Sequence, residues 1–179
     1  GVAGMSAYFA NVNRAKRSIA VDLSRPEGRE LVLRLCTAAD VFTQNFRPGV
    51  VERLGLGPDA VMTANSAIVY ASISGFGDEG PLASAPAYDH VVQAMSGFAA
   101  LQSEGVAEAA MVRHGVIDKA TAYSTAQAIT AALLERTKER GGLRPDVVVD
   151  DLSLILEQLH SIRLGDEART WELRRRYLA

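Results

Sequence analysis

The sequence has little of several residue types, and each shortage excludes a class of protein. Its 179 residues include one cysteine, Cys36, so no disulfide can form within the chain. Cys36 follows the apolar run at 31–35, a pattern that favours a buried structural thiol over a reactive one. A single unpaired cysteine is typical of a reducing compartment, and we expect a cytoplasmic protein.

Long apolar runs and an excess of one charge are also missing. No stretch of about 18 apolar residues occurs, so no membrane-spanning helix is expected. The first residues do not have a basic segment followed by an apolar one, which excludes a secretory signal there. The net charge is only −2, which gives no support for a nucleic-acid or membrane partner. No group of His, Cys, Asp or Glu has the spacing of metal ligands, so no metal is predicted.

The composition that remains is that of an ordinary globular domain. Hydrophobic residues make up 48% of the chain and charged residues 22%. Apolar strand-like runs alternate with helical patterns, which predicts an α/β fold with a mostly parallel sheet and flanking helices. We expect strands at 18–23, 41–42 and 67–74, and helices at 24–39, 50–54, from 58 onward, 88–101 and 119–138.

Two further expectations follow from this order. In a parallel sheet the ligand site lies at the carboxyl ends of the strands, so the loops after Phe42 and Ser74 should border it. The chain also changes character near residue 141, where glycines and a proline interrupt the pattern. We therefore expect a main domain at 1–140 and a divergent segment at 141–179, with an apolar strand or helix followed by a charged helix.

A lone carboxylate precedes the longest helical pattern. Asp118 lies just before a run without glycine or proline from Lys119 to about Lys138. Aspartate is a preferred N-cap residue, and the positive end of a helix stabilises its ionised form. The same anion is also able to serve as a nucleophile or base. From the residues alone, two roles of Asp118 stay possible: a simple helix cap and a catalytic group.

Several motifs, taken in order, resemble one known family. The segments that carry the resemblance are Tyr8-Phe-Ala-Asn-Val-Asn-Arg-Ala-Lys-Arg-Ser-Ile-Ala-Val-Asp-Leu23, Asn45-Phe-Arg-Pro-Gly49, Ser72-Ile-Ser-Gly-Phe-Gly77, Ala87-Tyr-Asp-His-Val-Val-Gln-Ala-Met-Ser-Gly97 and Asp118 followed by Ala131-Ala-Leu-Leu-Glu-Arg136. Over about residues 1–140 the chain is similar to the family III CoA-transferases. This carnitine and bile-acid CoA-transferase family also includes the α-methylacyl-CoA racemases.

The resemblance implies a Rossmann-like domain and a specific chemistry. Asp118 matches the family's catalytic aspartate, which attacks an acyl-CoA thioester and later carries CoA as an aspartyl thioester. A carboxylic acid is the acceptor, and CoA enters as a substrate and not as a tightly bound cofactor. Residues that match positions lining the family's CoA site are Asn45, Phe46, Arg53 and Leu54. Physically, Phe46 is suited to stack on adenine and Arg53 to pair with a phosphate, although a core phenylalanine and a solvated arginine are the plain alternatives.

Tyr88 bears on the choice of reaction. The racemases of this family have a histidine at the matching place, so Tyr88 favours the transferase branch and is a second candidate catalytic residue. Two histidines, His90 and His114, keep racemisation with Asp118 as the alternative. The loop Gly75-Phe76-Gly77 lacks the lysine of a phosphate-binding loop, and is interpreted as a mobile loop over the thioester or as a plain turn.

The chain also departs from the family pattern. Gly1 already lies inside the pattern, and a second domain found in full-length members is missing. Those members are interlocked dimers, so we expect this shortened chain to need a second copy or a complementing chain. A noncatalytic CoA-binding or dimerisation fragment is therefore a third possible function.

Overall fold

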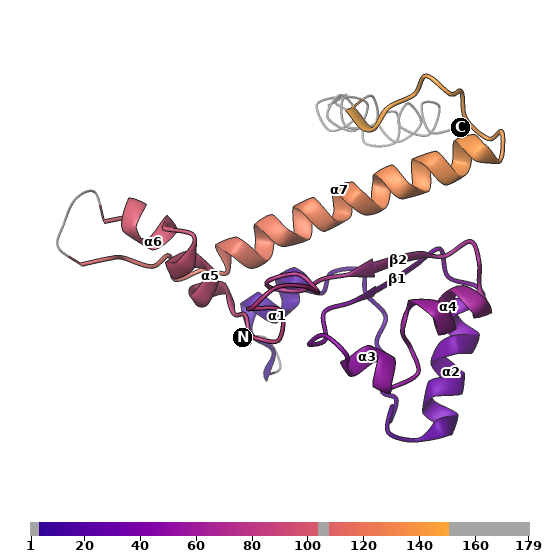
Figure 1. Cartoon of the computed structure of the whole chain (residues 1–179), viewed down its shortest axis with the longest axis horizontal. Coiled ribbons are helices and arrows are strands. Elements are labelled where there is room, and N and C mark those ends of the chain that lie inside the picture. Colours follow the sequence, from indigo (N-terminus) through magenta and orange to yellow (C-terminus); the bar gives the residue numbers. More distant parts are fainter. Residues whose placement is uncertain (1–3, 104–107, 151–179) are drawn as a thin grey trace.

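A computed structural model describes residues 4–103 and 108–150. Within these ranges the chain folds into helices around a small sheet (Figure 1). The elements in chain order are α1 (Ala7–Val12), α2 (Pro26–Cys36), β1 (Val41–Gln44), α3 (Val50–Arg53), α4 (Pro58–Ala64), β2 (Val69–Ser72), α5 (Asp89–Met95), α6 (Phe98–Leu101) and α7 (Val116–Glu139). Prolines begin α2 and α4, where a missing N–H costs nothing and the fixed φ suits a helix.

The sheet consists of two parallel strands. β1 and β2 pair in register from Val41 with Val69 to Gln44 with Ser72. In Figure 1, α7 runs along one side of this sheet, while α2, α3 and α4 lie on the other. The expected α/β architecture with a parallel sheet is therefore present, although the sheet is small.

The core lies between the sheet and the helices that connect its strands. Cys36, Val61 and Ile68 form its buried centre, with 0–6% of their surface exposed. Phe42 and Tyr70, at paired positions of the two strands, stack with ring centroids 5.2 Å apart. The sequence-based prediction that Cys36 is buried is confirmed, and burial raises the pKa of its thiol.

Three local predictions need correction. Residues 18–23 form no strand, and Ile19 is 63% exposed, because the described part of the chain supplies no neighbouring strand for them. The single helix expected at 88–101 is split into α5 and α6 at Gly97, whose φ of 78° is the left-handed conformation that interrupts a helix. The strand expected at 67–74 is shorter: β2 spans Val69–Ser72, and none of these four residues is fully buried.

The divergent segment expected at 141–179, with its apolar strand or helix and its charged helix, lies for the most part outside the described residues, which end at 150. No described helix, the 24-residue α7 included, combines the length and hydropathy needed to cross a membrane.

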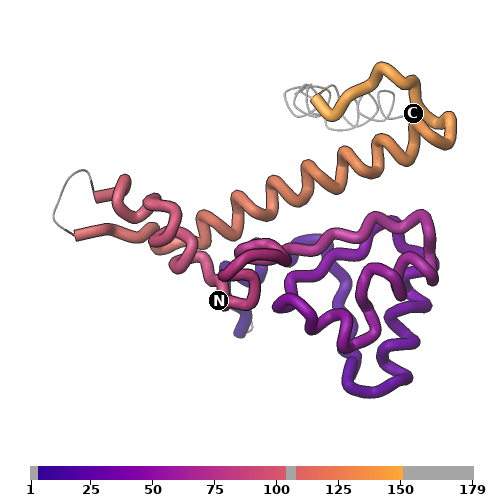
Figure 2. The backbone as a smooth tube through the Cα atoms, viewed as in Figure 1, coloured from indigo at the N-terminus to yellow at the C-terminus, as the bar shows by residue number. Residues whose placement is uncertain are grey.

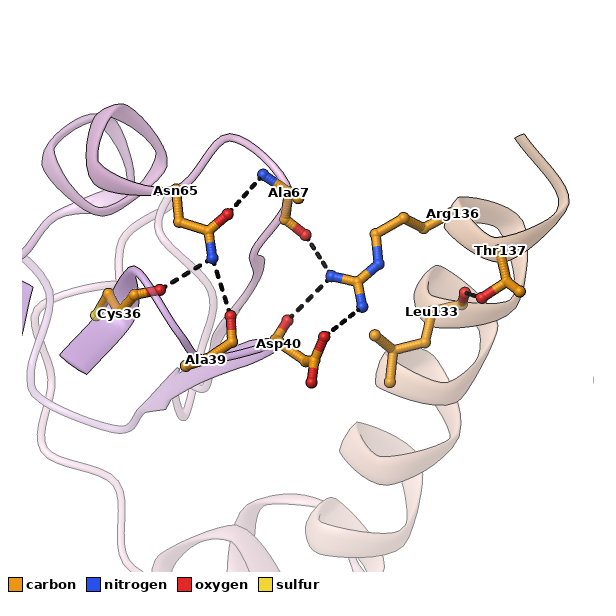
Figure 3. A network of polar contacts seen from close by, with 8 residues as sticks. All are labelled: Cys36, Ala39, Asp40, Asn65, Ala67, Leu133, Arg136 and Thr137. Atoms are coloured by element: carbon orange, nitrogen blue, oxygen red, sulfur yellow. Dashed lines mark hydrogen bonds and ion pairs between the residues drawn. The ribbon is translucent and has the colours of Figure 1, made fainter. Parts of the chain in front are cut away.

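α7 is fixed to the sheet by one arginine near its C-terminal end (Figure 3). The Arg136 guanidinium donates hydrogen bonds to the carbonyl oxygens of Ala67 and Asp40, and pairs with the Asp40 carboxylate at 2.8 Å. Asn65 supports the same corner by donating to the carbonyls of Cys36 and Ala39, each at 2.9 Å. Figure 2 shows how α7 then extends from this corner toward the turn around α5.

We expect Arg136→Ala to lower the free energy of unfolding by about 1–3 kcal/mol, because it leaves the partly buried Ala67 carbonyl without its charged donor. Asp40→Ala is the matched control, since Asp40 is 79% exposed and its ion pair should contribute less than about 1 kcal/mol. Urea unfolding at an unchanged m-value measures both variants. Equal losses would show that the carbonyl bonds do not anchor the helix.

Candidate functional site

A cavity of about 470 Å³ opens where the strands end and two helices begin. Asn45 directly follows β1, and Ile73 and Ser74 directly follow β2, so the cavity lies at the carboxyl ends of the parallel strands. The full set of lining residues is Asn45, Ile73, Ser74, Gly75, Ala87, Tyr88, Asp89, Val92, Ile117, Asp118, Thr121 and Ala122. Four residues selected from the sequence, at positions 45, 75, 88 and 118, thus border one space.

Asp118 lies inside the first turn of α7 and is not the N-cap. The N-cap is Gly115, which has no side chain to cap with, and the helix starts at Val116. No hydrogen bond from the described residues reaches the Asp118 carboxylate, which is exposed to the cavity. Of the two interpretations left open for Asp118, the simple N-cap is therefore wrong, because Asp89 accepts the N–H groups of this first turn.

Asp89 provides the cap from a different helix. Its Oδ1 accepts the backbone N–H of Ile117 at 2.7 Å and that of Asp118 at 3.0 Å. Asp89 was not among the residues selected from the sequence as candidates for the site. A residue 28 positions upstream gives no local capping signal, so only the folded chain shows this contact.

The electrostatics of Asp89 follow from these bonds. Its burial, with 8% of the residue exposed, acts to raise the pKa, but the hydrogen bonds from Asp118, Gln93 and Ile117 and the charge of His90 outweigh it. The pKa of Asp89 therefore lies below its ordinary value. A folded-state pKa below the unfolded one gives stability at neutral pH, which is lost as the pH falls through the folded-state value.

Gln93 stabilises the position of Asp89 through hydrogen bonds. It is fully buried, and its Nε2 donates to Asp89 Oδ2 and to the carbonyl oxygen of Val112. Its Oε1 accepts the Val112 N–H at 2.9 Å. Gln93 therefore ties α5 to the segment that leads into α7.

Tyr8 is a residue near the site that the sequence did not single out for chemistry. A Cβ placed on Gly115 would lie 3.3 Å from the Tyr8 hydroxyl and 3.2 Å from Asp118 Oδ2. Both oxygens thus lie next to the same glycine. Because Gly115 has no side chain, the space beside these oxygens is not filled by a Cβ. The only sequence signal was the place of Tyr8 at the start of the first family motif.

The glycine loop contributes one wall of the cavity. Gly75 lines it and packs so tightly on Ala87 that a Cβ at position 75 would lie 1.9 Å from the Ala87 Cβ. Phe76 and Gly77, which were expected to cover the site with it, are not among the lining residues. Gly77 has a φ of 79°, as the turn interpretation of this loop requires.

A second cavity of about 370 Å³ adjoins the first, and Ser74 lines both. Phe46 borders it with 44% of its surface exposed, together with Arg47, Tyr70 and Asp78. Arg53 and Leu54, the other predicted CoA contacts, line neither cavity. Arg53 is exposed on α3, and Leu54 follows it at the helix end.

The two histidines of the racemase alternative are placed differently from Asp118. His90 and His114 are both exposed, and neither is among the residues that line the two cavities. His114 precedes the N-cap of α7 and accepts the Val116 N–H with its backbone carbonyl at 2.6 Å.

Comparison with known proteins gives consistent matches. The sequence profile described as CoA-transferase family III matches residues 1–155. An acyl-CoA transferase of Fusarium pseudograminearum is 38% identical over 93% of this chain, and a succinate–glutarate CoA-transferase of Agrobacterium fabrum is 37% identical over 82% of it. The chain spans 37% of the length of each of these two relatives.

Solved structures give the same result. The crystal structure of a CaiB/BaiF family protein from Brucella suis superposes with a TM-score of 0.67 at 37% sequence identity. The match covers 69% of this chain and 33% of that protein.

Proposed function

Because this chain belongs to CoA-transferase family III, we propose that it transfers CoA from an acyl-CoA thioester to a carboxylic acid, with Asp118 as the covalent nucleophile. The observation that carries the proposal is the cavity that brings Asp118, Tyr88 and Asn45 together from distant parts of the sequence. Both relatives named above are CoA-transferases, and the Agrobacterium protein is named for two dicarboxylic acids. We propose an acceptor of the same carboxylic acid class here.

The chemistry suits an exposed carboxylate that accepts no hydrogen bond from the described residues. An Asp118 oxygen attacks the thioester carbonyl carbon, the C–S bond breaks, and CoA leaves as a thiolate while a mixed anhydride forms. The thiolate then attacks the aspartyl carbonyl and releases the donor acid, which leaves CoA on Asp118 as a thioester. The acceptor carboxylate attacks this thioester, its C–S bond breaks, and CoA leaves as a thiolate while a second mixed anhydride forms. The CoA thiolate finally attacks the acceptor carbonyl and restores the Asp118 carboxylate.

The adjoining cavities provide a path for the long CoA molecule. We propose that the thioester lies in the cavity of Asp118, with Asn45 and Tyr88 as neighbours, and that the nucleotide end extends toward Phe46. The exposed Phe46 ring is suited to stack on adenine. Arg53, exposed on α3, is proposed to reach a phosphate from outside the second cavity. Gly75 borders the reacting end, with Phe76 and Gly77 next to it in the loop.

The first turn of α7 supplies no free N–H donor for an oxyanion at Ile117 or Asp118. The N–H groups of Ile117 and Asp118 are bonded to Asp89, so they are not available to a tetrahedral intermediate. We propose that the missing stabilisation comes from the part of the relatives that this chain does not span, supplied by a second copy or a complementing chain.

Racemisation receives less support, since neither described histidine borders the cavity of Asp118. A noncatalytic CoA-binding or dimerisation fragment remains the other outcome of the test, because the chain spans only part of its relatives.

The test is the intact-protein mass after incubation with a panel of acyl-CoAs, with hydroxylamine added to trap the activated aspartyl group. We expect a CoA adduct on the wild-type chain, its conversion to a hydroxamate, and loss of both in Asp118→Ala. Peptide mapping should place the hydroxamate within the first turn of α7.

Three other outcomes oppose the proposal. An adduct that persists in Asp118→Ala would place the nucleophile elsewhere. CoA binding without any adduct, in a chain that unfolds cooperatively, would show that the chain is a noncatalytic CoA-binding module. Exchange of the acyl α-proton with deuterated water, without transfer, would identify the racemase reaction.

A further inference from the structure

Asp89 is the unusual carboxylate of this site, because it is buried while Asp118 is exposed. Among the described residues only Asp89 and Gln93 are both polar and buried. A buried carboxylate is unfavourable unless hydrogen bonds satisfy it. Asp89 accepts three: two from backbone N–H groups of α7 and one from Gln93 Nε2.

The N–H groups at the start of α7 are all accounted for. Val116 donates to the His114 carbonyl, Ile117 and Asp118 donate to Asp89, and Lys119 donates to the Gly115 carbonyl at 3.1 Å. Gly115 has no side chain that could cap the helix, so without Asp89 these N–H groups would bond to water or to a side chain of the first turn. Asp118 is the acidic residue of that turn, so it is the natural competitor for this role.

We propose that Asp89 is the positioning residue of Asp118: by capping α7 from another helix, it fixes the first turn and leaves the Asp118 carboxylate uncommitted and directed to the cavity. This inference rests on the proposed function, in which Asp118 is the nucleophile. Asp89 itself does not react, since its oxygens are occupied by hydrogen bonds from α7 and α5.

The arrangement of α5 makes Asp89 a rigid support. Asp89 is the first residue of α5, and Gln93 lies one turn further on the same helix. Because Gln93 also bonds both backbone groups of Val112, the cap, its helix and the chain leading into α7 form one closed network. Loss of Asp89 is therefore expected to act on the first turn of α7 more than on its distant end, which Arg136 holds separately.

The test compares Asp89→Ala, Asp89→Asn and the control Asp59→Ala in two measurements. Asp59 is exposed in the first turn of α4 and lines neither cavity. The first measurement is amide hydrogen exchange at Ile117 and Asp118, with Leu134 as an internal reference in the same helix. We expect roughly 2- to 30-fold faster exchange in Asp89→Ala, the range that corresponds to loss of a helix cap, and no change at Leu134 or in Asp59→Ala.

The second measurement is the rate of CoA-adduct formation on the full chain at saturating acyl-CoA, together with the half-saturating concentration. In Asp89→Ala we expect the saturated rate to fall by about 10-fold or more while half-saturation shifts less than about 3-fold, because a misplaced nucleophile loses reactivity and not substrate binding. Asp89→Asn keeps Oδ1 as an acceptor but turns its amide N–H toward Gln93 Nε2. It should therefore fall between wild type and Asp89→Ala in both measurements.

The outcomes separate this inference from the proposed function. Wild type without an adduct would overturn the proposed function, and the exchange measurement would still decide whether Asp89 caps α7. Unchanged exchange in folded Asp89→Ala overturns the inference, and so does faster exchange with a wild-type adduct rate. If Asp89→Ala fails to fold, wild-type values for both measurements in Asp89→Asn overturn it.

Discussion

Asp118→Asn is expected to lower steady-state CoA transfer by at least about 1,000-fold, because an amide cannot form the anhydride and thioester intermediates. The substitution preserves size, and no described residue hydrogen-bonds the carboxylate. The free energy of unfolding should therefore change by less than about 0.5 kcal/mol. Half-saturation by acyl-CoA should move little, since the side chain acts on the reacting carbonyl. Chromatographic separation of donor and product acyl-CoAs measures the rate.

The controls for this experiment address two ambiguities. Asp59→Asn makes the same chemical change at an exposed position of α4 that lines neither cavity, and should keep wild-type transfer. Asparagine can revert to aspartate by deamidation, so the intact mass must show that residual activity does not come from reverted protein. Transfer within 10-fold of wild type in verified Asp118→Asn would exclude the covalent mechanism at this position.

Gly75→Ala is expected to reduce transfer by roughly 100-fold with a much smaller effect on stability. The added Cβ would lie 1.9 Å from the Ala87 Cβ, so one of the two segments must move. Ala87 immediately precedes Tyr88 and Asp89, and displacement of that segment by about an ångström shifts the cavity wall and the cap of α7. Misplacement on this scale typically costs two orders of magnitude in rate.

A compensating substitution makes the prediction specific. In Gly75→Ala/Ala87→Gly the clashing methyl group is removed, and the nearest remaining atom, the position 87 Cα, lies at 3.4 Å, an ordinary contact. We expect the double variant to recover transfer to within about 5-fold of wild type. The single variant Ala87→Gly controls for added flexibility. If the double variant stays as impaired as Gly75→Ala, the contact between the two residues is not the cause.

The secondary structure was predictable wherever local signals were complete. Prolines at 26 and 58 marked the starts of α2 and α4, and the apolar runs after residues 40 and 66 marked β1 and β2. The failures have a common cause. Residues 18–23 have a strand pattern, but a strand also needs a partner, and the described chain provides none. Gly97 ended a helix that the surrounding residues would have continued.

The candidate site was predictable as a set of residues, while their roles in the structure were not. Asn45, Gly75, Tyr88 and Asp118 were selected from motifs and all line one cavity. Phe46 borders the neighbouring cavity, whereas Arg53 and Leu54 border neither. Motif matching places residues near a site, but which side chains face it depends on the local direction of the backbone. The catalytic and binding roles themselves stay predictions until the variants are measured.

The sequence by itself determined the family, the helical and strand segments around the sheet, and Asp118 as the candidate nucleophile, since these depend on local patterns and ordered motifs. Only the tertiary structure decided that Asp89 caps α7, that Gln93 closes the network behind it, and that Arg136 anchors the far end of the same helix. These contacts join residues 19 to 96 positions apart. No local pattern encodes such a pairing, because the partner of a buried polar group is set by which elements pack together.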